Sequence, residues 1–166
     1  AVSEDDYDFI LNTNLKGAFF LAREIGRAMV HRGRGCQVNV ASLNSDRPLK
    51  NVLPYAMSKA AIAHMTRGMA AEWGPHGVRV NGIAPGFIAT EMVLKDMKQE
   101  ALEQWKAKIP IKRLGRPDEI AATLMGVPYG TLDERTRKVA RHVAEIVAGR
   151  AVLPQYRAAQ CAVTQP

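Results

Sequence analysis

The 166-residue chain is 47% hydrophobic and carries a net charge of +7, values compatible with a globular domain or part of one. Its basic residues are scattered among carboxylates, with no basic run that interleaves aromatic side chains and no apolar run long enough to span a membrane, so we expect neither a nucleic-acid nor a membrane partner. Cys36 and Cys161 form neither a disulfide framework nor a metal-ligand pattern, and the acidic first ten residues do not resemble a signal peptide, so we expect a reduced, cytoplasmic setting.

Helix and strand patterns alternate along the first half of the chain. Ser3 is placed to cap a first helix, and acidic residues load the first turn of that helix. Apolar periodicity and turn residues predict, in chain order, a helix over 4–31, a strand over 36–41, a loop over 43–54, a helix over 55–73 and a strand over 78–83.

The second half begins with helical patterns and then changes in character. An amphipathic helix is predicted over 91–107, and a shorter helix over 118–125. Beyond these, a capped basic helix is followed by a stretch without clear periodicity. We therefore expect one domain part over 1–125 and a divergent helical tail over 126–166.

The alternation of helices and strands predicts a parallel α/β sheet, but two strands are too few for an independent sheet. Each of them would leave a bare edge, which proteins avoid. The pattern therefore predicts part of a doubly wound, Rossmann-type sheet whose N-terminal strands are missing, with an extra helix at the C-terminal end.

Tyr55 and Lys59 lie four residues apart near the start of a predicted helix, so both side chains share one face of it. Tyrosine is a weak acid with a pKa of about 10, and a nearby ammonium group lowers that value. The pair is therefore suited to proton transfer. The alternative is an ordinary amphipathic helix with a half-buried tyrosine and a solvated lysine, and the pair by itself does not exclude it.

Two further polar residues occupy positions typical of α/β active sites. Ser42 follows the first predicted strand, and the carboxyl ends of parallel strands are where such sites form. Asn14 lies inside the first predicted helix with Gly17 close by, although helix interiors disfavour both residue types. A local rule broken in this way indicates a functional position.

These residues together resemble the catalytic half of the short-chain dehydrogenase/reductase family. Asn14, Ser42, Tyr55 and Lys59 follow one another at steps of 28, 13 and 4 residues, as in the catalytic tetrad of that family. The matching stretches are Asn12–Gly17 (N-T-N-L-K-G), Val38–Ser42 (V-N-V-A-S), Tyr55–Ala60 (Y-A-M-S-K-A), Val78–Thr90 (V-R-V-N-G-I-A-P-G-F-I-A-T) and Leu114–Ile120 (L-G-R-P-D-E-I). In style they are closest to members similar to gluconate 5-dehydrogenase and 3-oxoacyl-carrier-protein reductase.

The resemblance implies a role for each member of the tetrad. Tyr55 would be the general acid in carbonyl reduction and the base in alcohol oxidation. Lys59 would lower the pKa of Tyr55 and bind the nicotinamide ribose. Ser42 would hold the substrate oxygen, and Asn14 would keep a water in a proton relay behind Lys59. A plain buried polar residue in a helix kink stays open for Asn14.

The resemblance also implies how NAD or NADP would be held. Tyr55 and Lys59 would take part, and Pro85 and Gly86 would shape a turn against the nicotinamide. The backbone of Ile88 and the hydroxyl of Thr90 would bind the carboxamide. Thr90 would also suit the N-cap of the next helix, and the two roles are compatible.

We therefore expect an NAD(P)-dependent oxidoreductase that interconverts a carbonyl and a secondary alcohol, with a keto-sugar acid or a 3-oxoacyl compound as the small-molecule substrate. No glycine-rich phosphate-binding turn is found in the sequence, which departs from the family. The alternative is an inactive fragment that serves as a subunit-association module. Helices 4–31 and 55–73 would form homo-oligomer contacts in either case, and the dispersed histidines predict no metal site.

Overall fold

The computed structural model describes residues 2–126, which fall into two compact units divided between Pro85 and Gly86. Each unit is described by itself. The predicted tail helix lies outside the described residues. The boundary between 1–125 and 126–166 therefore stays a prediction.

The first unit follows the predicted order of helices and strands. Ser3 caps the first helix as expected: its Oγ accepts a hydrogen bond from the backbone N–H of Asp6 at 3.1 Å. The elements are α1 Glu4–Leu11, a π-helical turn Asn12–Gly17, α2 Ala18–His31, β1 Gly35–Val40, a 3-10 turn Leu43–Ser45, α3 Leu53–Trp73, a 3-10 turn Gly74–His76 and β2 Val78–Ile83.

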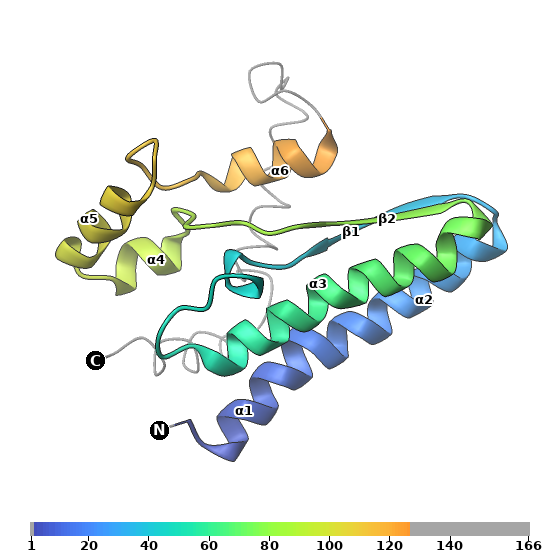
Figure 1. Ribbon diagram of the computed structural model, residues 1–166, viewed down its shortest axis with the longest axis horizontal. Coiled ribbons are helices and arrows are strands. Elements are labelled where there is room, and N and C mark those ends of the chain that lie inside the picture. Colours follow the sequence, from blue (N-terminus) through green and yellow to red (C-terminus); the bar gives the residue numbers. More distant parts are fainter. Residues whose placement is uncertain (1, 127–166) are drawn as a thin grey trace. The chain divides into compact units, whose positions relative to one another are not determined.

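β1 and β2 form a parallel pair, which confirms the predicted α/β class. Their register runs from Gly35 opposite Val78 to Val40 opposite Ile83. The ladder continues one residue past the end of β1, where the N–H of Ala41 donates to the carbonyl of Ile83 at 2.8 Å. Within residues 2–126 the sheet has these two strands, and α2 and α3 run along them (Figure 1).

The core of the first unit lies between the strands and α2 and α3. Val78 and Val80 alternate with exposed residues along β2 and point into this core, as expected for a strand with one covered face. Ala22 of α2 and Met69 of α3 complete the buried cluster. Partly buried side chains pack around it, namely Met29, Val30, Met65, Ala70 and Trp73.

A polar ladder also joins β1 to α3. Gln37 Nε2 donates to Asn39 Oδ1 at 3.0 Å, and Asn39 Nδ2 donates to Thr66 Oγ1 at 2.9 Å. The Thr66 hydroxyl in turn donates to the carbonyl of Ile62 at 2.8 Å. Because Gln37 and Asn39 are two residues apart on one face of the strand, the ladder specifies the position of α3 along β1.

In the second unit the prediction of a single helix over 91–107 is wrong. Two helices are found instead, α4 Glu91–Asp96 and α5 Gln99–Lys108. Met97 and Lys98 have extended backbone between them, with ψ of 137° and 145°. Neither residue is a glycine or a proline, so the break had no local signal in the sequence. The last described helix, α6 Pro117–Met125, matches its prediction closely.

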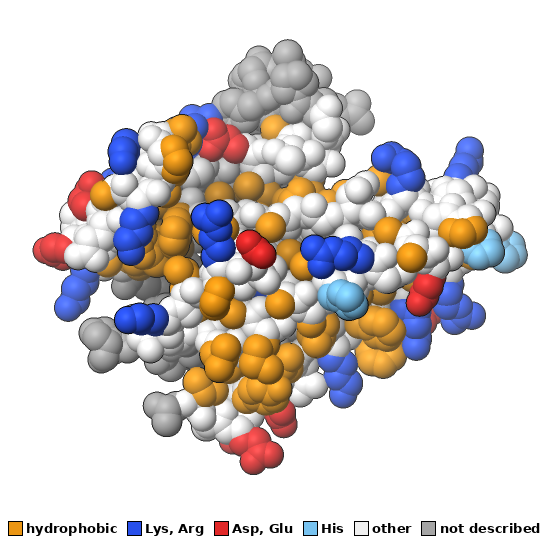
Figure 2. Space-filling view, viewed as in Figure 1, with side chains coloured by type: hydrophobic (Ala, Val, Ile, Leu, Met, Phe, Trp, Pro, Cys, Tyr) orange, Lys and Arg blue, Asp and Glu red, His pale blue; other side chains and the backbone are white. Residues whose placement is uncertain are grey.

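The described surface carries both charge and apolar side chains. Lys and Arg side chains are interspersed with Asp and Glu on the face shown in Figure 2, where apolar side chains also gather over the region of α1, α2 and α3. Among the described residues, no helix combines the length and the apolar character that a membrane span requires.

Gly26 of α2 gives a test of the core packing. A Cβ at this position would lie 2.3–2.7 Å from three ring atoms of Trp73, whereas a Cβ at Gly68 of α3 would meet nothing within 4 Å. We expect Gly26→Ala to lower the free energy of unfolding by about 1–3 kcal/mol through overpacking. Gly68→Ala is the matched control, and we expect it to raise stability by up to about 1 kcal/mol through helix propensity. Urea denaturation measures both, and a stabilised Gly26→Ala variant would contradict this description of the core.

Candidate active site

α3 carries Tyr55 and Lys59 on its first turns, close to the carboxyl end of β1. Pro54 near the helix start is compatible with a first turn, where a missing N–H costs no hydrogen bond. Lys59 Nζ lies 5.8 Å from the centroid of the Tyr55 ring, within the range of a cation–π contact. Lys59 Nζ also donates to the carbonyl of Val40, the last residue of β1, at 3.1 Å. The ammonium is therefore anchored to the strand beside the tyrosine.

Ser42 lies two residues beyond β1 and is buried. Its backbone is extended, with φ of −159° and ψ of 159°, and it caps the 3-10 turn that follows. Ser42 Oγ accepts from the N–H of Asn44 at 3.1 Å, and the Ser42 side chain is also hydrogen-bonded to that of Tyr55. Of the four residues in the expected tetrad, Ser42, Tyr55 and Lys59 therefore converge directly.

Asn14, the fourth residue of the expected tetrad, contacts α3 through the side chain of Ser58. It lies in the π-helical turn, a feature often found at functional positions in helices. Asn14 Nδ2 donates to Ser58 Oγ at 3.2 Å, and the Ser58 hydroxyl donates to the carbonyl of Tyr55 at 2.7 Å. Asn14, a residue type that helix interiors disfavour, thus contacts the helix that carries Tyr55 and Lys59.

Ser45 and Ser58 support the site and were not singled out from the sequence. Ser58 is fully buried between Asn14 and the backbone of Tyr55. The Ser45 hydroxyl accepts from the N–H of Ser42 at 3.3 Å and donates to the carbonyl of Lys59 at 2.8 Å. Sequence signals did exist, because Ser45 follows Ser42 by three residues and Ser58 follows Tyr55 by three, spacings at which serine hydroxyls reach nearby backbone.

Burial is the main cause of the pKa shifts of Tyr55 and Lys59. It raises the pKa of Tyr55 above its ordinary value of 10.0, and the hydrogen bond with Ser42 acts in the opposite direction. Burial also lowers the pKa of Lys59 from its ordinary value of 10.5. The expected lowering of the Tyr55 pKa by Lys59 is therefore not found in the chain on its own. The phenol is held protonated at neutral pH, the state that a proton donor requires.

The residues expected to shape the turn against the nicotinamide and to bind its carboxamide divide between the two units. Pro85 belongs to the first unit, where its carbonyl accepts from the N–H of Leu43 at 2.8 Å. Gly86, Ile88 and Thr90 belong to the second unit, and Gly86 is exposed there.

In the second unit Thr90 has the expected capping role. Its Oγ1 accepts from the N–H of Val93 at 3.3 Å and so caps α4. Its own N–H donates to the carbonyl of Ile88 at 2.8 Å. A capping hydroxyl that accepts one hydrogen bond retains a proton to donate, so capping does not exclude a ligand contact.

Metal chemistry has no candidate centre in the part of the chain that the structure describes. Within residues 2–126, no group of three or more His, Cys, Asp and Glu side chains is placed to hold a metal ion. The polar groups that do converge are hydroxyls and one ammonium, which suit proton transfer rather than metal binding.

Comparison with known proteins identifies the family to which the chain is similar. A family model described as enoyl-(acyl carrier protein) reductase matches residues 1–126. Gluconate 5-dehydrogenase of Gluconobacter oxydans is 38% identical over 119 residues, which cover 71% of this chain and 46% of that protein.

The chain belongs to the short-chain dehydrogenase/reductase family.

Solved structures of the family show how much of its fold is present. A 3-oxoacyl-[acyl-carrier protein] reductase from Brucella melitensis superimposes with a TM-score of 0.72 at 35% identity, over 75% of this chain and 47% of that one. A putative gluconate 5-dehydrogenase from Beutenbergia cavernae, solved with bound NADP, has a TM-score of 0.70 at 35% identity, over 75% and 51%. This short-chain dehydrogenase/reductase chain therefore spans about half the length of the relatives it matches, as expected for a partial Rossmann-type fold.

Titration of Tyr55 tests the electrostatics of the site. We expect a pKa above 10.0 for this phenol, because burial outweighs the hydrogen bond with Ser42. Ser42→Ala removes that hydrogen bond and should raise the pKa of Tyr55 further. Tyrosinate absorbance after a rapid pH jump measures the change, with Tyr55→Phe identifying the signal. A Tyr55 phenol that ionises below the ordinary value would contradict the dominance of burial.

Proposed function

We propose that this chain provides the nicotinamide end of the active site of an NAD(P)-dependent oxidoreductase that interconverts a carbonyl and a secondary alcohol. The observation that carries the proposal is the convergence of Ser42, Tyr55 and Lys59 at the carboxyl end of β1. Family membership supports it, because the relatives matched are dehydrogenases and reductases.

The residues present suit one end of the cofactor. The partly buried ammonium of Lys59 and the hydroxyl of Tyr55 can donate hydrogen bonds to the hydroxyls of a ribose. When bound, the nicotinamide ring supplies or accepts the hydride. Within residues 2–126 no glycine-rich turn follows a strand and precedes a helix, the arrangement that binds a pyrophosphate. The proposal for these residues is therefore confined to the nicotinamide end.

Tyr55 is assigned as the general acid and base. In carbonyl reduction its protonated phenol donates a proton to the substrate oxygen. The hydroxyl of Ser42, already hydrogen-bonded to Tyr55, holds the same oxygen. In alcohol oxidation the phenolate accepts the proton, and the ammonium of Lys59 lies 5.8 Å from the centroid of the ring that carries that anion.

Asn14 is assigned a supporting role behind the pair. Through Ser58 it contacts the backbone of Tyr55, and so it helps to hold the first turns of α3. We retain for it the water of a proton relay behind Lys59, which the family resemblance implies.

We propose a keto-sugar acid or a 3-oxoacyl compound as substrate. The support is the range of relatives, which includes a gluconate 5-dehydrogenase and a 3-oxoacyl-[acyl-carrier protein] reductase. Both reactions named in these relatives are carbonyl–alcohol interconversions, so the same proton transfer by Tyr55 serves either substrate.

Replacing Tyr55 tests the assigned chemistry. In the full chain, we expect Tyr55→Phe to lower carbonyl-dependent oxidation of NADH or NADPH by about 10²–10⁴-fold, because the proton donor is lost. Tyr7→Phe is the matched control, since Tyr7 is exposed on α1 and lies outside the site. Cofactor absorbance measures the rate. A Tyr55→Phe variant as active as the parent would overturn the mechanism, and a parent without cofactor binding or activity would overturn the enzyme proposal for this chain.

A second candidate function is subunit association without catalysis. Large apolar side chains are exposed on the two long helices of the first unit, which is the observation that favours it. On α2 Leu21 is 65% exposed, and on α3 Leu53 is 64% exposed. We propose that these helices form homo-oligomer contacts whether or not the chain is active. The exposed set is Phe19, Phe20, Leu21, Ile25, Leu53 and Met57.

A charge placed on α2 tests this association. We expect Leu21→Glu to shift the full chain from oligomer to monomer, because a buried carboxylate at a contact is unfavourable. Leu94→Glu is the matched control, since Leu94 is 54% exposed on α4 in the other unit. Sedimentation velocity measures the result. A parent that is already monomeric, or a Leu21→Glu variant that stays oligomeric, would contradict the role of α2.

A further inference from the structure

The Phe87–Thr90 segment of the second unit is held by Gly115. The N–H of Gly115 donates to the carbonyl of Phe87 at 2.9 Å, and the N–H of Ala89 donates to the carbonyl of Gly115 at 2.7 Å. These two bonds form an isolated parallel bridge between Ile88 and Gly115. The backbone of Ile88, assigned above to the carboxamide, thus lies between two bonds to a single residue.

Gly115 allows a close approach at this bridge. A Cβ at position 115 would lie 2.7 Å from Ile88 Cδ1 and 3.9 Å from Glu119 Oε2. A larger residue would therefore displace the side chain of Ile88. The same measurement places the carboxylate of Glu119 beside the bridge.

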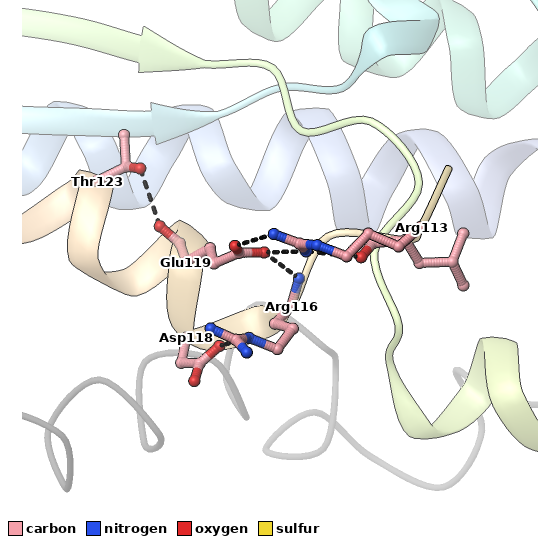
Figure 3. Close-up of polar contacts among 6 residues, drawn as sticks. Arg113, Arg116, Asp118, Glu119 and Thr123 are labelled. Carbon is pink, nitrogen blue, oxygen red and sulfur yellow. Dashed lines mark hydrogen bonds and ion pairs between the residues drawn. The ribbon is translucent and has the colours of Figure 1, made fainter. Parts of the chain in front are cut away.

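Arg113 and Glu119, which lie on either side of Gly115 in the sequence, are joined by hydrogen bonds (Figure 3). Arg113 Nη2 donates to Glu119 Oε1 at 2.7 Å, and Arg113 Nη1 donates to Glu119 Oε2 at 3.0 Å. The backbone N–H of Arg116 donates to the same Oε2 at 2.7 Å. A two-pronged arginine–carboxylate pair fixes orientation as well as distance, so the residues from 113 to 116 are tied to the first turn of α6.

The carboxylate of Glu119 stays charged at neutral pH. Hydrogen bonds from Arg113, followed by the backbone N–H of Arg116, lower the pKa of Glu119 from 4.5 to about 2. Asp118 faces the guanidinium of Arg116 at 3.4 Å, so the cluster holds two carboxylates and two guanidinium groups. The link between the loop and α6 is therefore ionic at neutral pH.

Trp105 supports the same segment from α5. Its ring lies 4.2 Å from that of Phe87, centroid to centroid, at an interplanar angle of 38°. Phe87 is thus held by an aromatic contact on its side chain and by Gly115 on its carbonyl. Ile88 is the next residue in the chain, so its backbone is held in place as well.

We propose that Arg113 and Glu119 are positioning residues that hold the Ile88–Thr90 backbone in the geometry needed to bind the nicotinamide carboxamide. The inference rests on the proposed function, because it assigns a purpose to that site. It adds to the site two residues that touch no reacting atom and act through Gly115.

Hydrogen exchange in the full chain without cofactor tests the structural half of the inference. Glu119→Gln removes the charge while keeping one acceptor, and Arg113→Lys keeps a charge while removing the two-pronged contact. We expect the amide of Ala89 to exchange about fivefold faster in both variants, with the amides of β2 unchanged. Glu103→Gln, an exposed carboxylate on α5 that binds Lys106, is the matched control and should change neither. An unchanged Ala89 amide in both variants would overturn the inference, whether or not cofactor binds.

A comparison of two cofactors tests the functional half. The probes are NADH and its 3-acetylpyridine analogue, in which a methyl ketone replaces the carboxamide. We expect Glu119→Gln to weaken NADH binding about fivefold and analogue binding less than about twofold, because only NADH offers the amide donor. Equal weakening of both would show a merely structural role and overturn the assignment. Faster Ala89 exchange in a chain that binds neither cofactor would instead overturn the proposed function and the carboxamide role with it.

Discussion

The contact of the Lys59 ammonium with the carbonyl of Val40 joins the helix that carries the candidate acid to the end of the strand beside it. A partly buried ammonium needs a hydrogen-bond acceptor, and the last carbonyl of β1 provides one. This requirement holds α3 at one height along the sheet, and the Gln37–Asn39–Thr66 ladder specifies the same position farther along the helix. Tyr55, one turn before Lys59, is then placed beside Ser42.

Short polar residues complete this arrangement, and three of the four hydrogen bonds that they make here go to backbone. Ser45 bridges the N–H of Ser42 and the carbonyl of Lys59, while Ser58 bridges Asn14 and the carbonyl of Tyr55. Each hydroxyl both accepts and donates, so no buried polar group in these links is left unsatisfied. The π-helical turn at Asn14 is the local departure from α-helical geometry that accompanies one of these links.

In the second unit, polar contacts hold a loop in place in a similar way. An arginine, a carboxylate and a glycine without a side chain bring two backbone segments 27 residues apart into a bridge, from Ile88 to Gly115. Thr90 ends that segment by capping α4, so the segment is held at both ends. Charge-assisted bonds suit this task, because a two-pronged arginine–carboxylate pair fixes orientation as well as distance.

The sequence by itself determined the parallel α/β class, the order of the elements of the first unit with their bounds to within two residues, and the family, because periodicity, capping and fixed spacings are local. It did not indicate the break between α4 and α5, since extended backbone at Met97 and Lys98 has no breaker residue to announce it. Only the tertiary structure decided that burial raises the pKa of Tyr55 although Lys59 lies beside it. It also decided that Ser45 binds the carbonyl of Lys59, that Asn14 binds Ser58 and that Arg113 binds Glu119. Desolvation and hydrogen bonding depend on which groups surround an atom in space, and a linear spacing does not contain that information.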